Sequence, residues 1–261
     1  MPKFAANLSL TFNEVPFLDR FAIAAGAGFE AVEYLFPYEY EPAELTARLQ
    51  SNGQQQVLFN GPPGDWTAGE RGIAALAGRE DEFRASVDVM LRYARALSCP
   101  TVHVMAGLVV GGMDNRRAVD TYVANLQYAC DRFAPHGITA LIEPLNPTDF
   151  PGYLASKQAH GRVLIERIAR PNMGLQLDLY HTQMGEGSIA AHIREFLPIA
   201  RHIQIAGVPG RHEPDVGEIN YPFLFDLLDE LGYTGWVGCE YRPKGDTLAG
   251  LGWLARYRAG R

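Results

Sequence analysis

The sequence predicts an α/β fold, specifically a (β/α)₈ barrel of the TIM type built as a single domain over residues 1–261. Short β-rich runs alternate with longer amphipathic stretches along the chain, which is typical of βα units around a parallel sheet. Eight such pairs can be counted, the number that closes a barrel. The length of 261 residues suits two smaller domains equally well. No flexible linker or charge block divides the chain, so we expect one domain.

Each predicted strand is a short apolar or β-branched run that precedes a helical or loop-plus-helix segment. The eight runs are Lys3–Leu8, Ala31–Leu35, Gln55–Asn60, Thr101–Met105, Thr139–Glu143, Gly174–Asp178, His202–Ala206 and Trp236–Glu240.

Local signals mark two of the helices between these strands. Asp114 opens a long apolar-periodic stretch that reaches Phe133. Ser156 is expected to cap the stretch up to Ile168, which Arg170 and Pro171 then end.

Two connections, Gly61–Arg79 and Pro144–Leu154, are longer than a minimal βα loop and rich in glycine or proline. Both follow the carboxyl end of a strand, where barrel active sites form. The segment around Trp66 suits a lid that excludes water from a reactive intermediate, and a purely structural loop explains it nearly as well.

The composition favours a small-molecule substrate. A formal net charge of −7 and a pI near 5.5 argue against nucleic-acid binding, which needs an excess of basic residues on one face. Three scattered cysteines exclude a disulfide framework and fit a reducing compartment. The amino terminus reads as a strand, and no run of about 18 apolar residues occurs. We therefore expect a soluble, cytoplasmic protein without membrane partners, and the sequence leaves its oligomeric state open, a homo-oligomer included.

Side chains alternate between the interior and the helix layer along a barrel strand, so polar residues of one parity should gather inside. With the last residue of each strand taken as inward, the interior parity holds Asn60, His103, Glu143, Gln176, Asp178, His202, Gln204 and Glu240. The opposite parity holds the apolar residues Val102, Ile142, Leu177, Ile203, Val237 and Cys239.

Buried acids need a partner, because an unpaired polar group in the interior costs on the order of 1–3 kcal/mol and a carboxylate more. A divalent cation, Mg²⁺ or Mn²⁺, is the simplest partner for Glu143, Asp178, Gln204 and Glu240, since hard cations prefer carboxylate and amide oxygens. The alternative is a structural network in which Arg or Lys neutralises these acids.

Five further residues are candidates for substrate contact or for ordinary structural roles. His181 follows Asp178 by three residues and could donate to a substrate oxygen, or be a solvent-exposed loop histidine. Arg211 supplies a cation for a substrate carboxylate. His103 and Asn60 share the interior parity and are assigned to the substrate, although His103 and His202 also suit satisfied core histidines.

Several motifs together resemble the hydroxypyruvate isomerase family, within the xylose-isomerase-like TIM barrels that also include ketose 3-epimerases and endonuclease IV-type enzymes. The likeness spans essentially the whole chain. Its residues are Phe59–Trp66 with Gly69–Gly72, Glu143–Asn146 with Pro151–Tyr153, Asp178–His181, and Gln204–Pro214 with Gly217–Tyr221.

The resemblance implies one divalent metal held by Glu143, Asp178, Gln204 and Glu240. It further implies that Glu143 and Glu240 lie on either side of the substrate as proton donor and acceptor. Ketose 3-epimerases carry histidine at the third ligand position, where this chain has Gln204. This departure favours the hydroxypyruvate branch over the sugar epimerases.

The expected reaction interconverts hydroxypyruvate and tartronate semialdehyde (2-hydroxy-3-oxopropanoate) through a cis-enediolate. The nearest alternative is a 2-oxo-tetronate isomerase, whose four-carbon substrate needs only a slightly larger pocket. A zinc-dependent DNA-repair endonuclease of the same fold would need more histidine ligands and a basic groove. A sugar-acid binding protein that has lost its metal is the remaining alternative.

Overall fold

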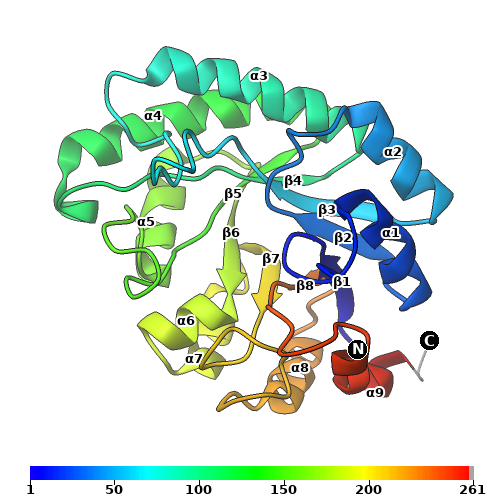
Figure 1. Ribbon diagram of the computed structural model, residues 1–261. Helices are drawn as coiled ribbons and strands as arrows, with labels where there is room; N and C mark the ends of the chain where they lie inside the picture. The colour runs from blue at the N-terminus through cyan, green and yellow to red at the C-terminus, as the bar shows by residue number, and fades with distance from the viewer. Residues whose placement is uncertain (259–261) are drawn as a thin grey trace.

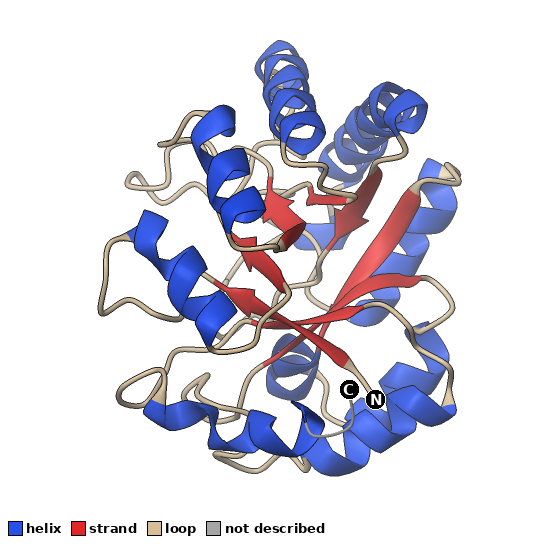
Figure 2. Cartoon of the chain, turned by 90° about the vertical axis from the view of Figure 1, so that its right-hand side faces the viewer, coloured by secondary structure: helices blue, strands red, loops and turns tan. Residues whose placement is uncertain are grey.

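Eight parallel strands close into a barrel in the computed structural model, which describes residues 1–258, and they follow one another around it in chain order (Figures 1 and 2). The TIM-type fold expected from the sequence is therefore confirmed. The strands are β1 (Lys3–Asn7), β2 (Ala31–Tyr34), β3 (Gln55–Asn60), β4 (Thr101–His103), β5 (Thr139–Ile142), β6 (Met173–Asp178), β7 (Ala200–Ile205) and β8 (Trp236–Cys239).

Helices surround this barrel on the outside and connect consecutive strands (Figure 2). The α-helices are α1 (Phe17–Gly26), α2 (Pro42–Ser51), α3 (Glu80–Ala96), α4 (Arg116–Phe133), α5 (Gln158–Ile168), α6 (Leu179–Gly185), α7 (Ile189–Phe196), α8 (Tyr221–Glu230) and α9 (Ala255–Arg258). Short 3₁₀ turns are η1 (Gly112–Asp114), η2 (Ala134–His136) and η3 (Ala249–Leu254). Within residues 1–258, none of the helices combines the length and apolar character that crossing a bilayer requires.

The apolar parity predicted for the helix-facing side is confirmed. Val102, Ile142, Leu177, Ile203, Val237 and Cys239 are at most 1% exposed and belong to the core that joins the barrel to its helices. A second, smaller apolar cluster of Ala5, Ala31 and Val57, with Trp236 against it, lies inside the barrel near the strand starts. The barrel interior is therefore apolar near the amino ends of the strands and leaves the other end to polar residues.

Six strands end one or two residues earlier than predicted. Glu143 and Glu240, for example, follow β5 and β8 as the first loop residues. The ladder between β7 and β8 ends at the pair Ile205 and Cys239, so Glu240 has no partner in it. The acids at these positions therefore lie outside the strand pairing, buried at the carboxyl end of the barrel.

Both predicted helix starts need correction. Asp114 lies in η1, and α4 begins only at Arg116, because the Asn115 side chain caps it by accepting from the Ala118 N–H at 3.2 Å. Ser156 caps nothing: α5 begins at Gln158, whose backbone N–H donates to Glu186 Oε1 at 2.8 Å. A side chain distant in sequence provides this cap, so the local sequence carries no signal for it.

Candidate active site

Three acids lie at the carboxyl end of the barrel and are nearly inaccessible to solvent. Glu143 follows β5, Asp178 ends β6 and Glu240 follows β8, with exposures of 5%, 1% and 6%. In an α/β barrel this end is formed by the βα loops and is where catalytic groups gather. The structure thus turns all three predicted acids toward the interior.

Asp178 has two differently engaged carboxylate oxygens. It is the N-cap of α6, and its Oδ1 accepts from the backbone N–H groups of Tyr180 at 2.7 Å and His181 at 3.4 Å. Its Oδ2 lies 3.4 Å from an Arg211 guanidinium nitrogen and 3.8 Å from His181 Nε2. One oxygen is therefore used to hold the side chain in place, and the other faces the site.

His181 is a buried, neutral imidazole. Burial lowers its pKa well below the ordinary value, and the nearby charge of Arg211 acts in the same direction. Its Nδ1 accepts from the Asn146 backbone N–H at 3.2 Å, which places the ring proton on Nε2. That Nε2–H is the group that faces Asp178, so His181 is not the exposed loop residue that the sequence left as an alternative.

Glu143 shares its surroundings with His103 and Asn60. Its Oε2 lies 3.3 Å from His103 Nδ1, which is also 3.3 Å from Asn60 Oδ1. Burial lowers the pKa of His103 to about 3, so this histidine is neutral. Oε1 of Glu143 is buried and has no hydrogen-bond partner. A buried acceptor without a donor is costly and marks a place where a ligand group is expected.

Arg211 provides the positive charge at the rim. Its guanidinium lies 2.5 Å from Glu240 Oε2 and 3.4 Å from Asp178 Oδ2, and it packs 4.8 Å from the Tyr180 ring centre. Burial alone would lower the pKa of Arg211, but the carboxylates of Glu240 and Asp178 raise it above its ordinary value. The positive side chain that the sequence predicted for a substrate carboxylate is thus at the rim, although two acids of the site contact it.

The acids of the site retain protons more strongly than free carboxyl groups. Burial raises the pKa of Glu240 to about 8, against the opposing effect of Arg211. Burial and the charges of Glu240 and Asp178 raise the pKa of Glu143 well above its ordinary value. The pKa of Asp178 is also raised by burial. An additional positive charge nearby would lower these pKa values.

Glu143, Asp178 and His181 form a group that could hold a metal ion. One ligand atom from each lies within 4.8 Å of the others, and among the acids, histidines and cysteines of residues 1–258 this is the one such group of three. Glu240 stands outside it, because Arg211 engages its carboxylate. Two of the four predicted ligands are thus brought together, joined by a histidine that the sequence assigned to the substrate.

Gln204, the fourth predicted ligand, is fixed by hydrogen bonds at both ends of its amide. Its Nε2 donates to Glu33 Oε1 at 2.8 Å, and its Oε1 accepts from Gln176 Nε2 at 2.6 Å. His202 also reaches Glu33, with 2.6 Å between its Nε2 and Glu33 Oε2. His202 is thus a satisfied core histidine, as one reading of the sequence expected.

Sequence reasoning missed Glu33 and Asn7. Glu33 lies two residues before Leu35 and so has the inward parity of its predicted strand, a signal that was present in the sequence. Asn7 was hidden because Leu8 was taken as the inward end of the first strand. In the structure Asn7 pairs with Glu33 between β1 and β2, and its Nδ2 donates to Glu33 Oε1 at 3.0 Å.

Trp66 lies in the long β3–α3 connection with 38% of its surface exposed. The Arg71 guanidinium stacks 3.8 Å from its ring centre, and Phe36 contacts its edge at 5.2 Å between ring centres. Both the lid and the purely structural interpretation of this segment are compatible with these contacts.

Comparison with known proteins places this chain in a family. The sequence model described as xylose isomerase-like TIM barrel matches residues 21–257. A 2-oxo-tetronate isomerase of Cupriavidus necator is 53% identical over 98% of this chain and 99% of its own length. A hydroxypyruvate isomerase of Escherichia coli is 43% identical over 99% of this chain and all of its own. A crystal structure from Brucella melitensis, described as an AP endonuclease of family 2, superposes with a TM-score of 0.96 at 53% identity, covering 98% of this chain and 99% of that one.

Proposed function

The chain belongs to the xylose isomerase-like TIM barrel family and is an isomerase, and we propose that it moves the carbonyl of a short 2-oxo-3-hydroxy acid from C2 to C3 with the help of one divalent metal ion. The observation that carries this proposal is the buried acid group at the carboxyl end of the barrel, in which Glu143 keeps one oxygen without a donor.

The donor set fits a divalent cation. Glu143 and Asp178 provide carboxylate oxygens within 4.8 Å of each other, and the His181 ring beside them carries its proton on Nε2. Glu240 and Gln204 complete the set that the family resemblance implies. Mg²⁺ and Mn²⁺ suit such oxygen-rich sites. When bound, the cation supplies Lewis-acid stabilisation of negative charge on the substrate oxygens.

Glu143 and Glu240 are the proposed proton carriers. One carboxylate removes the proton from C3 of the substrate, which leaves a cis-enediolate, and the other carboxyl group returns a proton to C2. A general base works best when its pKa lies near the operating pH, and burial acts in that direction on both residues. Glu143 follows β5 and Glu240 follows β8, so in strand order they lie on either side of Asp178 at the end of β6.

Arg211 is proposed to bind the substrate carboxylate. Its guanidinium is buried among acids and can exchange one carboxylate partner for another, since a planar fork binds carboxylates in two-point fashion. His181 offers its Nε2–H to a substrate oxygen. His103 and Asn60 form the wall beside Glu143, where they fix its orientation and contact the substrate.

We favour the four-carbon acid 2-oxo-tetronate as substrate, with hydroxypyruvate as the second candidate. The identity of 53% to a 2-oxo-tetronate isomerase against 43% to a hydroxypyruvate isomerase supports this order, which reverses the order expected from the sequence alone. Both substrates carry a 2-oxo-3-hydroxy acid unit and need the same proton transfers. They differ by one hydroxymethyl group, which a pocket discriminates by only about 1–3 kcal/mol.

Other chemistries are less well supported. A DNA-repair endonuclease is suggested by the description of the Brucella structure, but a net charge of −7 opposes binding to a phosphate backbone. A ketose 3-epimerase would carry histidine where this chain has Gln204. A metal-free binding protein would not need a buried acid group with an unpaired oxygen.

The deciding experiment measures metal content and isomerase activity together. Purified protein is stripped of metal, reloaded with Mg²⁺ or Mn²⁺, and supplied with 2-oxo-tetronate or hydroxypyruvate in parallel. We expect metal-dependent isomerisation with a higher kcat/KM for the four-carbon acid. Activity on neither acid, together with nicking of a duplex that contains abasic sites, would refute the proposal.

A further inference from the structure

Glu33 lies inside the barrel directly beneath the three site acids, Glu143, Asp178 and Glu240. It is 1% exposed, and it contacts residues that each precede a site residue by two positions: His202 before Gln204, and Gly238 before Glu240. Two residues along a strand return to the same face, so Glu33 occupies the next layer of the interior. No step of the proposed reaction uses this carboxylate.

Three side chains converge on Glu33 from two other strands. Asn7 Nδ2 donates to Oε1 at 3.0 Å, Gln204 Nε2 donates to the same oxygen at 2.8 Å, and His202 Nε2 lies 2.6 Å from Oε2. Every donor is 2% exposed or less. A buried carboxylate with this many donors is held in one orientation, because any rotation would break hydrogen bonds that water cannot replace.

The barrel also keeps space free for this carboxylate. A Cβ atom on Gly238 would lie 2.2 Å from Glu33 Oε2 and 2.5 Å from its carboxyl carbon. Any residue other than glycine on this part of β8 would displace the acid. The absence of a side chain at Gly238 is therefore matched to the presence of one at Glu33.

The contacts of Gln204 depend on this arrangement. If its amide were turned over, Oε1 would face the Glu33 carboxylate, which sets two acceptors against each other. Gln176 could turn with it, since Gln176 Oε1 has no partner, so the contact with Glu33 decides the orientation. The observed orientation turns the amide oxygen toward β6, the strand that carries Asp178 and pairs Asp178 with Gln204.

We propose that Glu33 is a positioning residue that orients Gln204, so that its amide oxygen and not its nitrogen is presented to the metal ion. This inference rests on the metal binding of the proposed function. Residues behind the ligands of a metal site commonly set ligand orientation, and their loss lowers metal affinity about 10–100-fold. Glu33 acts through Gln204 and touches neither metal nor substrate.

The test compares Mn²⁺ affinity by titration calorimetry in wild-type protein and Glu33→Leu, which is similar in size and leaves Gln204 Nε2 without its acceptor at 33. We expect Mn²⁺ to bind about 10–100-fold more weakly in the variant, and excess Mn²⁺ to restore most of kcat. A merely structural role would lower the melting temperature and leave the Kd unchanged. Gln54→Leu is the control, because Gln54 is buried and donates to Phe29 O before the start of β3, at the amino end of the barrel.

A double variant that exchanges the carboxylate at 33 and the amide at 204 makes the test more specific. In Glu33→Gln/Gln204→Glu the amide at 33 can donate to a carboxylate at 204, so an oriented ligand oxygen returns. We expect the double variant to recover the Mn²⁺ affinity that Glu33→Leu loses. Should Glu33→Leu not fold, Gly238→Ala displaces the carboxylate without removing it and is expected to weaken Mn²⁺ binding as well.

The outcomes separate the two proposals. A folded Glu33→Leu or Gly238→Ala protein with the Kd of the wild type would overturn the positioning role alone. Wild-type protein that binds no Mn²⁺ would overturn the inference together with the metal site. Wild-type protein that binds Mn²⁺ but isomerises neither acid would overturn the proposed reaction and leave the role of Glu33 intact.

Discussion

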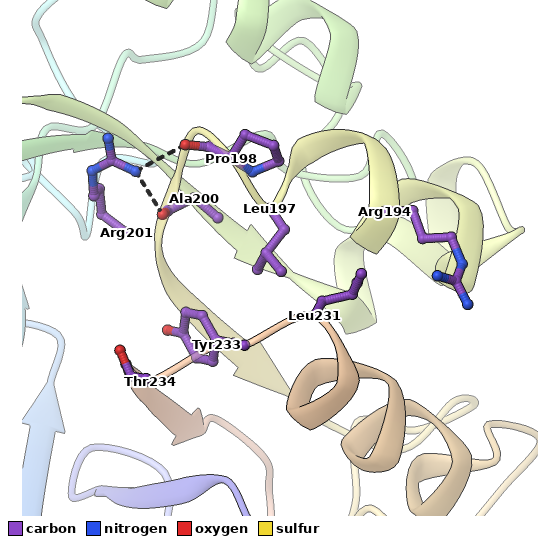
Figure 3. A pocket seen from close by; sticks show the side chains of 10 residues that line it. Arg194, Leu197, Pro198, Ala200, Arg201, Leu231, Tyr233 and Thr234 are labelled. Carbon is purple, nitrogen blue, oxygen red and sulfur yellow. Dashed lines mark hydrogen bonds between the residues drawn. The ribbon is translucent and has the colours of Figure 1, made fainter.

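At the amino end of the barrel the interior is filled by Ala5, Ala31 and Val57, which are 0–4% exposed, whereas the carboxyl end holds Glu143 and Asp178 at 5% and 1%. The side chains at the two ends are thus similarly buried, but those at the amino end are apolar and those at the carboxyl end are acidic. A pocket of about 480 Å³ also opens at the amino end, between the segments that precede β7 and β8 (Figure 3). It is lined by Arg194, Leu197, Pro198, Ala200, Arg201 and Leu231–Gly235.

That pocket contains none of the acids, and the nearby Arg201 guanidinium donates to the backbone carbonyls of Pro198 and Ala200 (Figure 3). The comparison separates two uses of a barrel interior. Apolar burial at one end stabilises the fold, and buried acids at the other reduce stability unless a cation or a proton accompanies them. Variants at the amino end should therefore change the free energy of unfolding, and variants at the carboxyl end should change kcat.

The largest expected effect concerns the proton carriers. Glu143→Gln and Glu240→Gln should each lower kcat by about 10²-fold or more, because general base catalysis is lost while side-chain size is kept. Steady-state assays at saturating metal measure this, with circular dichroism to confirm an intact fold. Near-normal turnover in either variant would refute the assignment.

Metal removal should come next. Stripping the protein with EDTA is expected to lower activity at least about 10-fold, and Mn²⁺ or Mg²⁺ should restore it, since the cation stabilises charge that develops during the reaction. Apo protein that retains full activity would contradict the metal requirement. The interior of the amino end, filled by Ala5, Ala31 and Val57, contains none of the three site acids and should not respond to metal removal.

A substitution at the amino end should change stability and leave chemistry unaltered. Val57→Ala removes two methyl groups from a site that is 4% exposed, which should lower the free energy of unfolding by about 0.5–3 kcal/mol. Thermal melting would show a decrease of roughly 2–4 °C for each kcal/mol. A variant that folds normally but loses most of its kcat would break the division between the two ends.

The smallest effect concerns pH. The pKa of Glu240 is raised to about 8 in the folded protein, so folding favours its protonated form, and this contribution to stability is lost as pH rises through 8. His103 and His181, whose pKa values are lowered, act with the opposite sign only below the ordinary histidine range. The melting temperature of metal-free protein should therefore fall between pH 7 and 8.

Bound Mn²⁺ should remove this decline, because it takes the place of the proton. A melting temperature that rises from pH 7 to 8 in metal-free protein would contradict the raised pKa of Glu240. Glu240→Gln serves as the matched control, since it cannot titrate and should show a flatter profile.

Strand periodicity predicted the barrel because alternation is a local property of the sequence. The same rule correctly turned Val102, Ile142 and Cys239 toward the helices. It failed for Asn7, because the inward residue near the end of the first strand is Asn7 and not Leu8. Parity arguments therefore depend on which residue is chosen as inward, and one residue of difference reverses the assigned faces.

Contacts between distant segments could not be predicted in the same way. The cap of α5 by Glu186 and the bond between Glu33 and His202 each join separate βα units, so no short pattern encodes them. The pairing of Arg211 with Glu240 depends likewise on how two loops meet at the rim. The residue types of the site were readable from the sequence, but their partners were not.

Anomalous diffraction from crystals grown with Mn²⁺ tests the central claim most directly. We predict one strong manganese peak inside the carboxyl end of the barrel, about 2.0–2.5 Å from oxygens of Glu143, Asp178, Gln204 and Glu240, with Arg211 withdrawn from Glu240. A peak elsewhere, or a peak bound by Glu143, Asp178 and His181 while Gln204 and Glu240 keep their present partners, would contradict the four-oxygen site.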